Sequence, residues 1–205
     1  MPAHRPHIVH NLSLTGLLWL SLTGCAVRPI VNLAEPSLSR QQQEHATLVA
    51  IRQRGQTGDW LVIRGVHATD NLVASMTNMA LSHAGVLDLA QMQVIEADGS
   101  GVHLTPLPEF IGKSARLMLI RPQWSGGEVA VARAYQLLGR HYDYTGLIGL
   151  NQPERYYCTE LAISIYTSAA ESDHGNPIPP VIAPGQLYHW GTILYDSGPV
   201  LTLPP

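Results

Sequence analysis

The chain has 205 residues, a formal net charge of -3 and a sequence pI of about 6.3. That length suits one domain with its own core, and the slightly acidic balance excludes the basic face of a typical nucleic-acid-binding protein. Charged residues make up only 13% of the chain, so the body of the protein is not expected to be disordered.

The N-terminal segment, residues 1–24, has the features of a secretory signal peptide. A weakly basic start precedes an apolar run over 12–22, which is too short to span a bilayer as a stop-transfer helix. The run ends in Leu22-Thr23-Gly24-Cys25, which resembles the bacterial lipobox, where cleavage before the cysteine leaves that residue lipidated. We therefore expect acyl chains on Cys25 to anchor the protein. The alternative is an ordinary signal peptide with an incidental cysteine.

The chain has two cysteines, Cys25 and Cys158. A disulfide between them would be the default pairing in an exported protein. If lipid occupies Cys25, Cys158 remains a free thiol in a compartment where idle thiols tend to be oxidised. A free thiol there is easier to explain when it takes part in chemistry.

Beyond a proline-containing tether over 25–38, one domain is expected over 39–205. Apolar periodicity and Gly or Pro breaks predict its elements. Asp70 is expected to cap the second helix, with Leu72, Met76, Met79 and Ala80 inward. Tight turns between strands predict antiparallel hairpins. The predicted helices cover 39–54, 72–81 and 129–138, and the predicted strands cover 58–65, 82–89, 91–98, 102–107, 115–121 and 192–196.

Cys158 lies where a polar, tyrosine-rich segment turns into an apolar run. Leu161, Ala162, Ile165 and Tyr166 follow with nearly the spacing of a buried helix face, which places Cys158 in the first helical turn. Backbone N–H groups in that turn lack intrahelical acceptors, and the helix dipole favours negative charge there. Both effects favour the thiolate, which is the nucleophilic form of cysteine. The alternative is a buried structural cysteine.

Four short motifs of the chain are Gly58-Asp59-Trp60, Ser82-His83-Ala84-Gly85-Val86, Ile95-Glu96-Ala97 and Tyr157-Cys158-Thr159-Glu160-Leu161. Together they resemble the YiiX/YaeF-like group of the NlpC-type papain-like superfamily, in its circularly permuted form. In permuted members the histidine strand precedes the cysteine helix, and the order of motifs here is the same. The resemblance covers about residues 58–166, and the lipoprotein start is also similar to that of YaeF-like proteins.

The resemblance implies an α+β, papain-like fold, with an antiparallel sheet or partial barrel packed against helices and the nucleophile at a helix N-terminus. It implies Cys158 as nucleophile, His83 as its base and Glu96 as the residue that orients the imidazole. Asp98 and His103 are rival orienting residues.

An oxyanion in such a site needs preorganised donors. The backbone N–H of Cys158 is one candidate, and a side chain from Tyr142 or Trp60 is a second, although either could equally be core packing. Glu160 matches the acidic position that follows the cysteine in the family, and we interpret it as a partner of the helix dipole. The chain has no His-Glu-x-x-His motif and no cysteine pair, so we expect neither a metal site nor a cofactor.

These observations predict a membrane-anchored cysteine hydrolase that acts on peptide amides, with cell-wall peptide (peptidoglycan) as one candidate substrate. The expected location is the outer membrane, facing the periplasm, with no nucleic-acid partner. Three alternatives remain open. They are a lipid-directed amidase, thioesterase or acyltransferase, a non-catalytic envelope binding module, and a structural lipoprotein with a buried Cys158.

Overall fold

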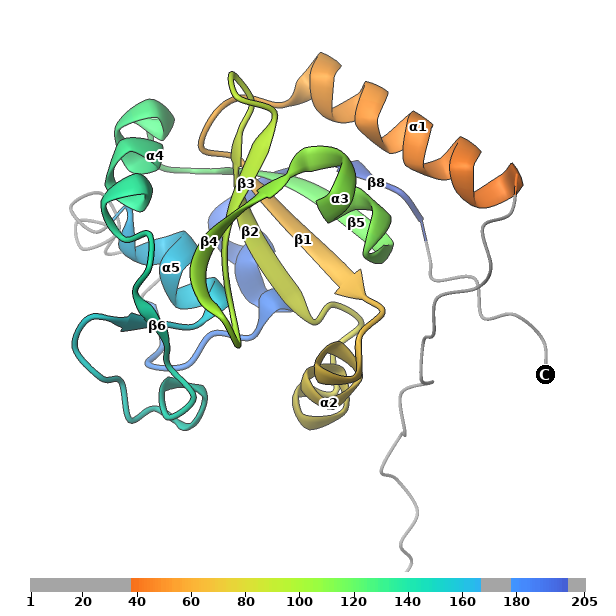
Figure 1. The fold of residues 1–205 in the computed structure, drawn as a ribbon. Coiled ribbons are helices and arrows are strands. Elements are labelled where there is room, and N and C mark those ends of the chain that lie inside the picture. Colours follow the sequence, from red (N-terminus) through yellow and green to blue (C-terminus); the bar gives the residue numbers. More distant parts are fainter. Residues whose placement is uncertain (1–37, 167–177, 199–205) are drawn as a thin grey trace, which may run out of the picture.

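The computed structural model describes residues 38–166 and 178–198, and Figure 1 shows its strands gathered in a sheet with helices around it. The six strands pair antiparallel in the order β4-β3-β2-β1-β5-β8. The sheet is open, since β4 and β8 form its two edges. The strands are β1 (Trp60–Gly65), β2 (His83–Asp88), β3 (Gln93–Asp98), β4 (Gly101–Pro106), β5 (Ser114–Pro122) and β8 (Gly191–Asp196).

Helices and a small two-stranded parallel sheet complete the described part of the chain. The predicted α+β class, with an antiparallel sheet packed against helices, is therefore confirmed. The helices are α1 (Leu38–Arg54), α2 (Ala68–Thr77), α3 (Leu107–Gly112), α4 (Gly127–Gln136) and α5 (Cys158–Ser164), the 3-10 helices are η1 (Gly146–Ile148) and η2 (Pro184–Trp190), and the small sheet pairs β6 (His141–Tyr142) with β7 (Arg155–Tyr156).

Two apolar clusters lie on opposite faces of the sheet, and β1 contributes to both. Alternate side chains of a strand point to opposite faces. Trp60 and Val62 pack in the cluster that contains buried residues of α4 and α5, whereas Leu61 and Ile63 pack with residues of α1 and α3. Burial on both faces explains why β1 is a continuous apolar run rather than an alternating one.

The start of β1 is tied to the two helices of the first cluster. Gly58 has a φ of +96°, and a Cβ there would lie 2.4 Å from the Cα of Gly127 at the start of α4. The hydroxyl of Tyr166, just beyond α5, donates to the Gly58 carbonyl at 2.8 Å. The buried Asp59 carboxylate accepts two hydrogen bonds from Arg121. Two residues of the Gly-Asp-Trp motif therefore join elements of the fold.

The prediction for α2 was wrong in both position and orientation. The helix begins at Ala68, so Asp70 lies inside its first turn rather than at its cap. The Asp70 carboxylate is buried because it accepts hydrogen bonds from the His67 N–H and from the Ser82 hydroxyl, which precedes β2. These bonds turn that side of the helix inward. Leu72 and Met76, which were expected to be buried, are 59% and 70% exposed.

A short helix that the sequence did not predict, α3, follows β4. The expected strand over 102–107 ends at Pro106, and Leu107 begins the helix with a proline in its first turn. Phe110 and Ile111 of α3 are buried in the second apolar cluster. The other predicted elements within the described residues agree with the observed ones to within a few residues.

Part of the sequence-based account falls outside the described residues. The predicted signal peptide, Cys25 and the tether up to residue 37 belong there. Within 38–166 and 178–198, no helix has the length and apolar character needed to cross a membrane.

Candidate active site

Cys158 is the first residue of α5 and is 5% exposed. The preceding residue, Tyr157, is extended, and its N–H donates to the Glu160 carboxylate at 3.3 Å. The Thr159 hydroxyl donates to the carbonyl of Ile182 at 2.6 Å, which fixes the first turn against the following segment. The predicted placement of Cys158 in the first turn is confirmed, at the end of the helix where the dipole favours negative charge.

His83 is the first residue of β2, and its Nε2 lies 2.5 Å from Oε2 of Glu96 on β3. Cys158 lies close enough to His83 for its negative charge to act on the imidazole. Burial alone would lower the pKa of His83. The hydrogen bonds and negative charges of Cys158 and Glu96 outweigh burial and raise that pKa to about 10.

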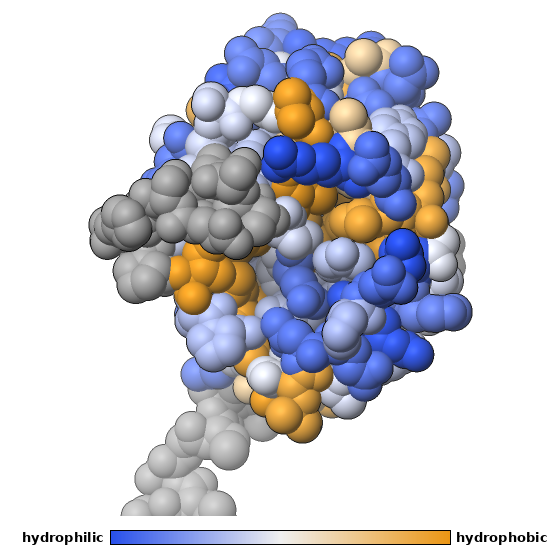
Figure 2. All heavy atoms as spheres, turned by 90° about the vertical axis from the view of Figure 1, so that its left-hand side faces the viewer, coloured by the Kyte–Doolittle hydropathy of each residue, from blue (hydrophilic) through white to orange (hydrophobic). Residues whose placement is uncertain are grey.

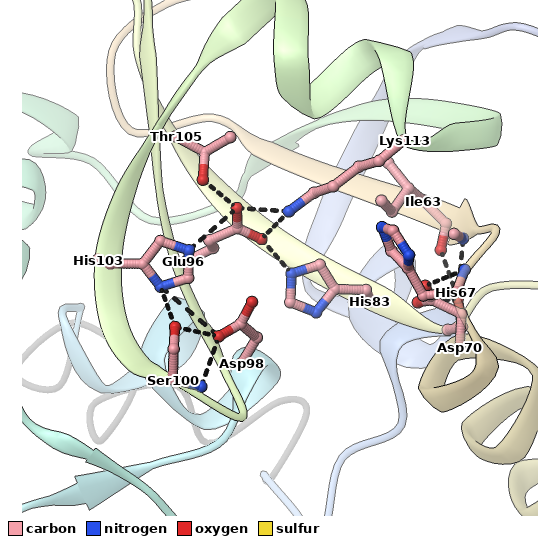
Figure 3. Close-up of polar contacts among 12 residues, drawn as sticks. Ile63, His67, Asp70, His83, Glu96, Asp98, Ser100, His103, Thr105 and Lys113 are labelled. Atoms are coloured by element: carbon pink, nitrogen blue, oxygen red, sulfur yellow. Dashed lines mark hydrogen bonds and ion pairs between the residues drawn. The ribbon is translucent and has the colours of Figure 1, made fainter.

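Glu96 is fully buried and is the acceptor for several donors (Figure 3). Lys113 donates to both of its carboxylate oxygens, at 2.5 and 2.7 Å, and the Thr105 hydroxyl donates to Oε1. His103 Nε2 lies 3.6 Å from the same oxygen. Burial would raise the pKa of Glu96, but His83 and Lys113 lower it to about 2. The carboxylate is thus held ionised inside the protein.

The rival orienting residues do not contact His83 among the described interactions. The carboxylate of Asp98 accepts the backbone N–H and the hydroxyl of Ser100 and is 44% exposed. His103 lies next to Glu96 rather than next to His83, and its Nδ1 lies 3.0 Å from the carbonyl of Gly101. The geometry therefore brings Glu96, rather than Asp98, to His83.

The two candidate oxyanion residues have different surroundings. Trp60 is fully buried, its indole N–H donates to the carbonyl of Ala162 at 3.0 Å, and its ring packs edge-on against Trp124. This donor is used inside the core, so the assignment of Trp60 to the oxyanion is withdrawn. Tyr142 is half-buried, and burial followed by the nearby charge of Cys158 raises its pKa. Tyr142 therefore remains a candidate beside the thiol.

A buried carboxylate, Asp143, shapes the loop between β6 and β7. Its two oxygens accept the backbone N–H groups of Thr145, Gly146 and Gln152 at 2.8 to 3.0 Å. Burial would raise the pKa of Asp143, but these donors lower it. The loop leads through β7 into Cys158, so a residue without an assigned role in the sequence helps to set the position of the nucleophile.

Glu160 lies beside this carboxylate in the first turn of α5. Burial and the nearby charge of Asp143 raise the pKa of Glu160 to about 7, although the Tyr157 N–H acts in the opposite direction. Near pH 7 the Glu160 side chain is therefore only partly ionised. It is then a weaker partner for the helix dipole than the fully ionised carboxylate that we expected.

Sequence reasoning missed three residues that surround the His83–Glu96 pair: Thr105, Phe110 and Lys113. The Phe110 ring lies 6.0 Å from the His83 ring and 4.9 Å from Lys113 Nζ. All three come from α3 and its flanks, which had been assigned as a strand end and a loop. One signal was present, because Lys113 is the only lysine among the 12 lysines and arginines of the chain. Its neighbours Gly112 and Ser114 had suggested only an incomplete phosphate-binding loop.

No group of three or more His, Cys, Asp or Glu side chains in the described part of the chain is arranged to hold a metal ion. The site brings together a thiol, an imidazole and a carboxylate from three different elements. Such a set can generate a thiolate nucleophile and can return a proton to a leaving group.

Comparison with protein families agrees with this geometry. The family model of the permuted papain-like amidase enzymes YaeF/YiiX, the C92 family, matches residues 28–177. The chain belongs to this family. No curated protein matches the chain significantly. Membership in the permuted papain-like amidase family confirms the resemblance drawn from the four motifs, and it makes the protein a thiol hydrolase rather than a binding module or a structural lipoprotein.

Proposed function

We propose that this permuted papain-like amidase is a membrane-anchored enzyme that cleaves amide bonds with Cys158, His83 and Glu96. The observation that carries the proposal is the 2.5 Å contact between His83 and the fully buried Glu96 carboxylate, near enough to Cys158 for the thiol to act on the His83 ring. A nucleophile, a base and an orienting group in this order are the requirements for covalent catalysis.

In the proposed reaction, Cys158 transfers its proton to His83, and the thiolate attacks the carbonyl carbon of an amide. The tetrahedral intermediate collapses when His83 returns the proton to the leaving nitrogen, which departs as an amine. The thioester that remains is attacked by water, from which His83 removes a proton, and the acid product leaves as the thiol is restored. Glu96 keeps the ring oriented and stabilises the imidazolium at each stage.

The oxyanion of the tetrahedral intermediate would be stabilised by the backbone N–H of Cys158 and the hydroxyl of Tyr142. The first-turn N–H groups of a helix have no intrahelical acceptor and are therefore suitable donors. The charge of Cys158 acts on Tyr142, which supports their proximity.

The proposed substrate is a peptide amide, with the cell wall as one source, and membership in an amidase family supports it. A lipid-directed activity is the second candidate, because the loop that leads to Cys158 carries apolar side chains at its surface. Tyr144, Ile148 and Leu150 are 63%, 67% and 64% exposed, and the Tyr144 ring packs 4.9 Å from that of Tyr142. Figure 2, viewed from the side that carries β6 and α4, has hydrophobic patches among hydrophilic side chains.

Labelling with matched electrophiles tests these two substrate classes. A peptide-like and a lipid-like acyl electrophile, each with the same reactive group, are added to the full chain, and the Cys158 peptide is followed by mass spectrometry. If the substrate is a peptide, Cys158 should be modified faster by the peptide-like probe than by the lipid-like probe. His83→Ala should be labelled more slowly than wild type. Faster reaction with the lipid-like probe would assign the second candidate instead.

Anchoring is proposed through lipid on Cys25, at the outer membrane and facing the periplasm. The lipobox sequence Leu22-Thr23-Gly24-Cys25 supports it, and two or more acyl chains hold a protein at a bilayer far more firmly than one. Cys25→Ser is expected to release the protein from membranes or to block its processing. A Cys25→Ser protein that fractionates and migrates like wild type would contradict the proposal.

A further inference from the structure

The carboxylate of Glu96 has a second charged partner besides His83. Lys113 Nζ lies 2.5 Å from Oε1 and 2.7 Å from Oε2, whereas His83 approaches Oε2 alone. The lysine therefore bridges both oxygens of the residue that orients the imidazole (Figure 3).

The backbone and side chain of Lys113 are both held in place. Lys113 is the last residue before β5, and its N–H donates to the carbonyl of Glu109 in α3. The ammonium lies 4.9 Å from the centre of the Phe110 ring, which also contacts His83. The side chain is only 20% exposed, so its charge is screened by water less than that of a surface lysine.

Once the thiol of Cys158 has given its proton to His83, the side chains of Cys158, His83, Glu96 and Lys113 carry alternating charges. His83 faces Glu96 from β2, His103 and the uncharged Thr105 from β4, and Lys113 from the junction of α3 and β5. The charge of Cys158 also acts on His83, and the Asp98 carboxylate lies 3.7 Å from His103 Nδ1. Thiolate, imidazolium, carboxylate and ammonium then sum to zero.

We propose that Lys113 is a positioning residue that keeps the buried Glu96 ionised and thereby holds His83 ready to pair with the Cys158 thiolate. This inference rests on the proposed roles of Cys158, His83 and Glu96. A carboxylate without water is costly unless it is paired, and the imidazole is neutral for part of the reaction cycle. Lys113 supplies a charge partner that is present at every stage.

A purely structural lysine would contribute to folding and leave the chemistry of the thiol unchanged. A lysine that acts through Glu96 must alter the pH at which the thiolate–imidazolium pair forms. An opposite charge within about 4–6 Å lowers a carboxyl pKa by about 1–3 units, so removal of the ammonium should raise the pKa of Glu96 by that order. Glu96 would then take up a proton in mild acid and release its hold on His83.

The test is the rate of iodoacetamide reaction at Cys158 between pH 4 and pH 9, followed on the Cys158 peptide of the full chain by mass spectrometry. Lys113→Met is expected to move the acid limb of this profile to higher pH by about 1 unit or more. The matched control is Arg116→Met, which removes a cation three residues further along, in β5, where it pairs with Asp196 at 2.9 and 2.5 Å. The control is expected to lower the melting temperature while its acid limb coincides with that of wild type.

Lys113→Gln, which keeps N–H donors but no charge, is measured in parallel and takes the place of Lys113→Met if the latter does not fold. If neither variant folds, the test uses the NMR signal of the single lysine of the wild-type chain. Its 15Nζ resonance needs no assignment and is expected to shift when Glu96 is replaced by Gln. The proposal for Lys113 would be overturned if the acid limb of the iodoacetamide profile in the lysine variants coincided with that of wild type. An unchanged 15Nζ resonance in Glu96→Gln would overturn it as well. A wild-type profile with only one transition near pH 8.5 would instead overturn the proposed function.

Discussion

His83 Nε2 and Glu96 Oε2 lie 2.5 Å apart because of the register between two neighbouring strands. Gly85 of β2 is the cross-strand partner of Glu96 in β3, and His83 lies two residues before Gly85 on the same face. Diagonal neighbours on one sheet face are within reach of long side chains. A one-residue slip between β2 and β3 would place Glu96 and His83 on opposite faces and break the pair.

The first prediction concerns this pair. His83→Ala is expected to lower kcat/KM by about 10²–10⁴-fold, because the reaction loses its general base and acid. Glu96→Gln is expected to retain measurable activity, since the amide can still hold the ring but no longer stabilises the imidazolium. The measurement is kcat/KM of wild type and of each variant on the same amide substrate. Full activity in His83→Ala would remove the proposed base, and a neutral Glu96→Gln beside an impaired Asp98→Asn would move the orienting role to Asp98.

The same pair predicts a pH dependence of stability. The pKa of Glu96 is about 2 in the folded protein against 4.5 for an ordinary glutamate, so its contribution is present above pH 4.5 and is lost as the pH falls toward 2. The pKa of His83 is about 10 against 6.5 for an ordinary histidine, so its contribution is present below pH 6.5 and is lost as the pH rises through 10.

We therefore expect the free energy of unfolding of wild type to fall between pH 7 and pH 10 by more than that of His83→Gln. Urea denaturation at several pH values measures both proteins under the same conditions, so the difference isolates His83 from other titrating groups. Parallel curves for the two proteins would contradict the assigned pKa of His83.

Glu160 predicts the reverse of Glu96, because its pKa is raised rather than lowered. Its pKa is raised from 4.5 to about 7, so between these values the unfolded chain releases its proton more readily than the folded one. The ionised form of Glu160 thus costs stability above pH 7. Glu160→Gln, which is neutral and can still accept the Tyr157 N–H, is expected to raise the melting temperature at pH 8 and to leave it nearly unchanged at pH 4.5. A gain of equal size at both pH values would show that charge is not the cause.

Tyr142 tests the second oxyanion donor. Tyr142→Phe removes the hydroxyl and is expected to lower kcat by about 10²–10³-fold, the usual loss for one such donor. Tyr144→Phe is the matched control, because Tyr144 packs on Tyr142 and its hydroxyl donates to the Gly99 carbonyl. Equal activity in the two variants would leave Tyr142 as a packing residue only.

The sequence was sufficient wherever a local pattern and the packing agreed. The apolar spacing after Cys158 predicted α5 correctly, because Leu161 and Ala162 are buried against the sheet as the pattern requires. For α2 the pattern misled. The apolar Leu72 and Met76 face outward because the hydrogen bond between Asp70 and Ser82 holds the opposite side of the helix toward the sheet. No periodicity rule anticipates a buried aspartate.

The site could be predicted only in part for a similar reason. Cys158, His83 and Glu96 belong to short motifs whose order is informative in sequence, and the structure brings these three residues together. Thr105 contacts Glu96 across the predicted hairpin of β3 and β4, whereas Lys113 contacts it because of α3, a helix that the sequence did not reveal. Trp60 lay in a motif as well, yet its N–H is used by Ala162 inside the core. Motif membership alone does not separate catalytic from packing residues.

The reactivity of Cys158 tests the central claim most directly. Cys158→Ala is expected to fold with a loss of about 1 kcal/mol or less, and Cys158→Ser to lose activity because a serine hydroxyl is far harder to deprotonate. The decisive measurement is the rate of iodoacetamide modification of Cys158 in folded wild type as a function of pH. The account predicts faster reaction at pH 6 than for a free small-molecule thiol, because His83 is the base that takes the proton of the thiol. Slow reaction with one titration near pH 8.5, the value for an ordinary cysteine, would contradict the assignment of Cys158 as nucleophile.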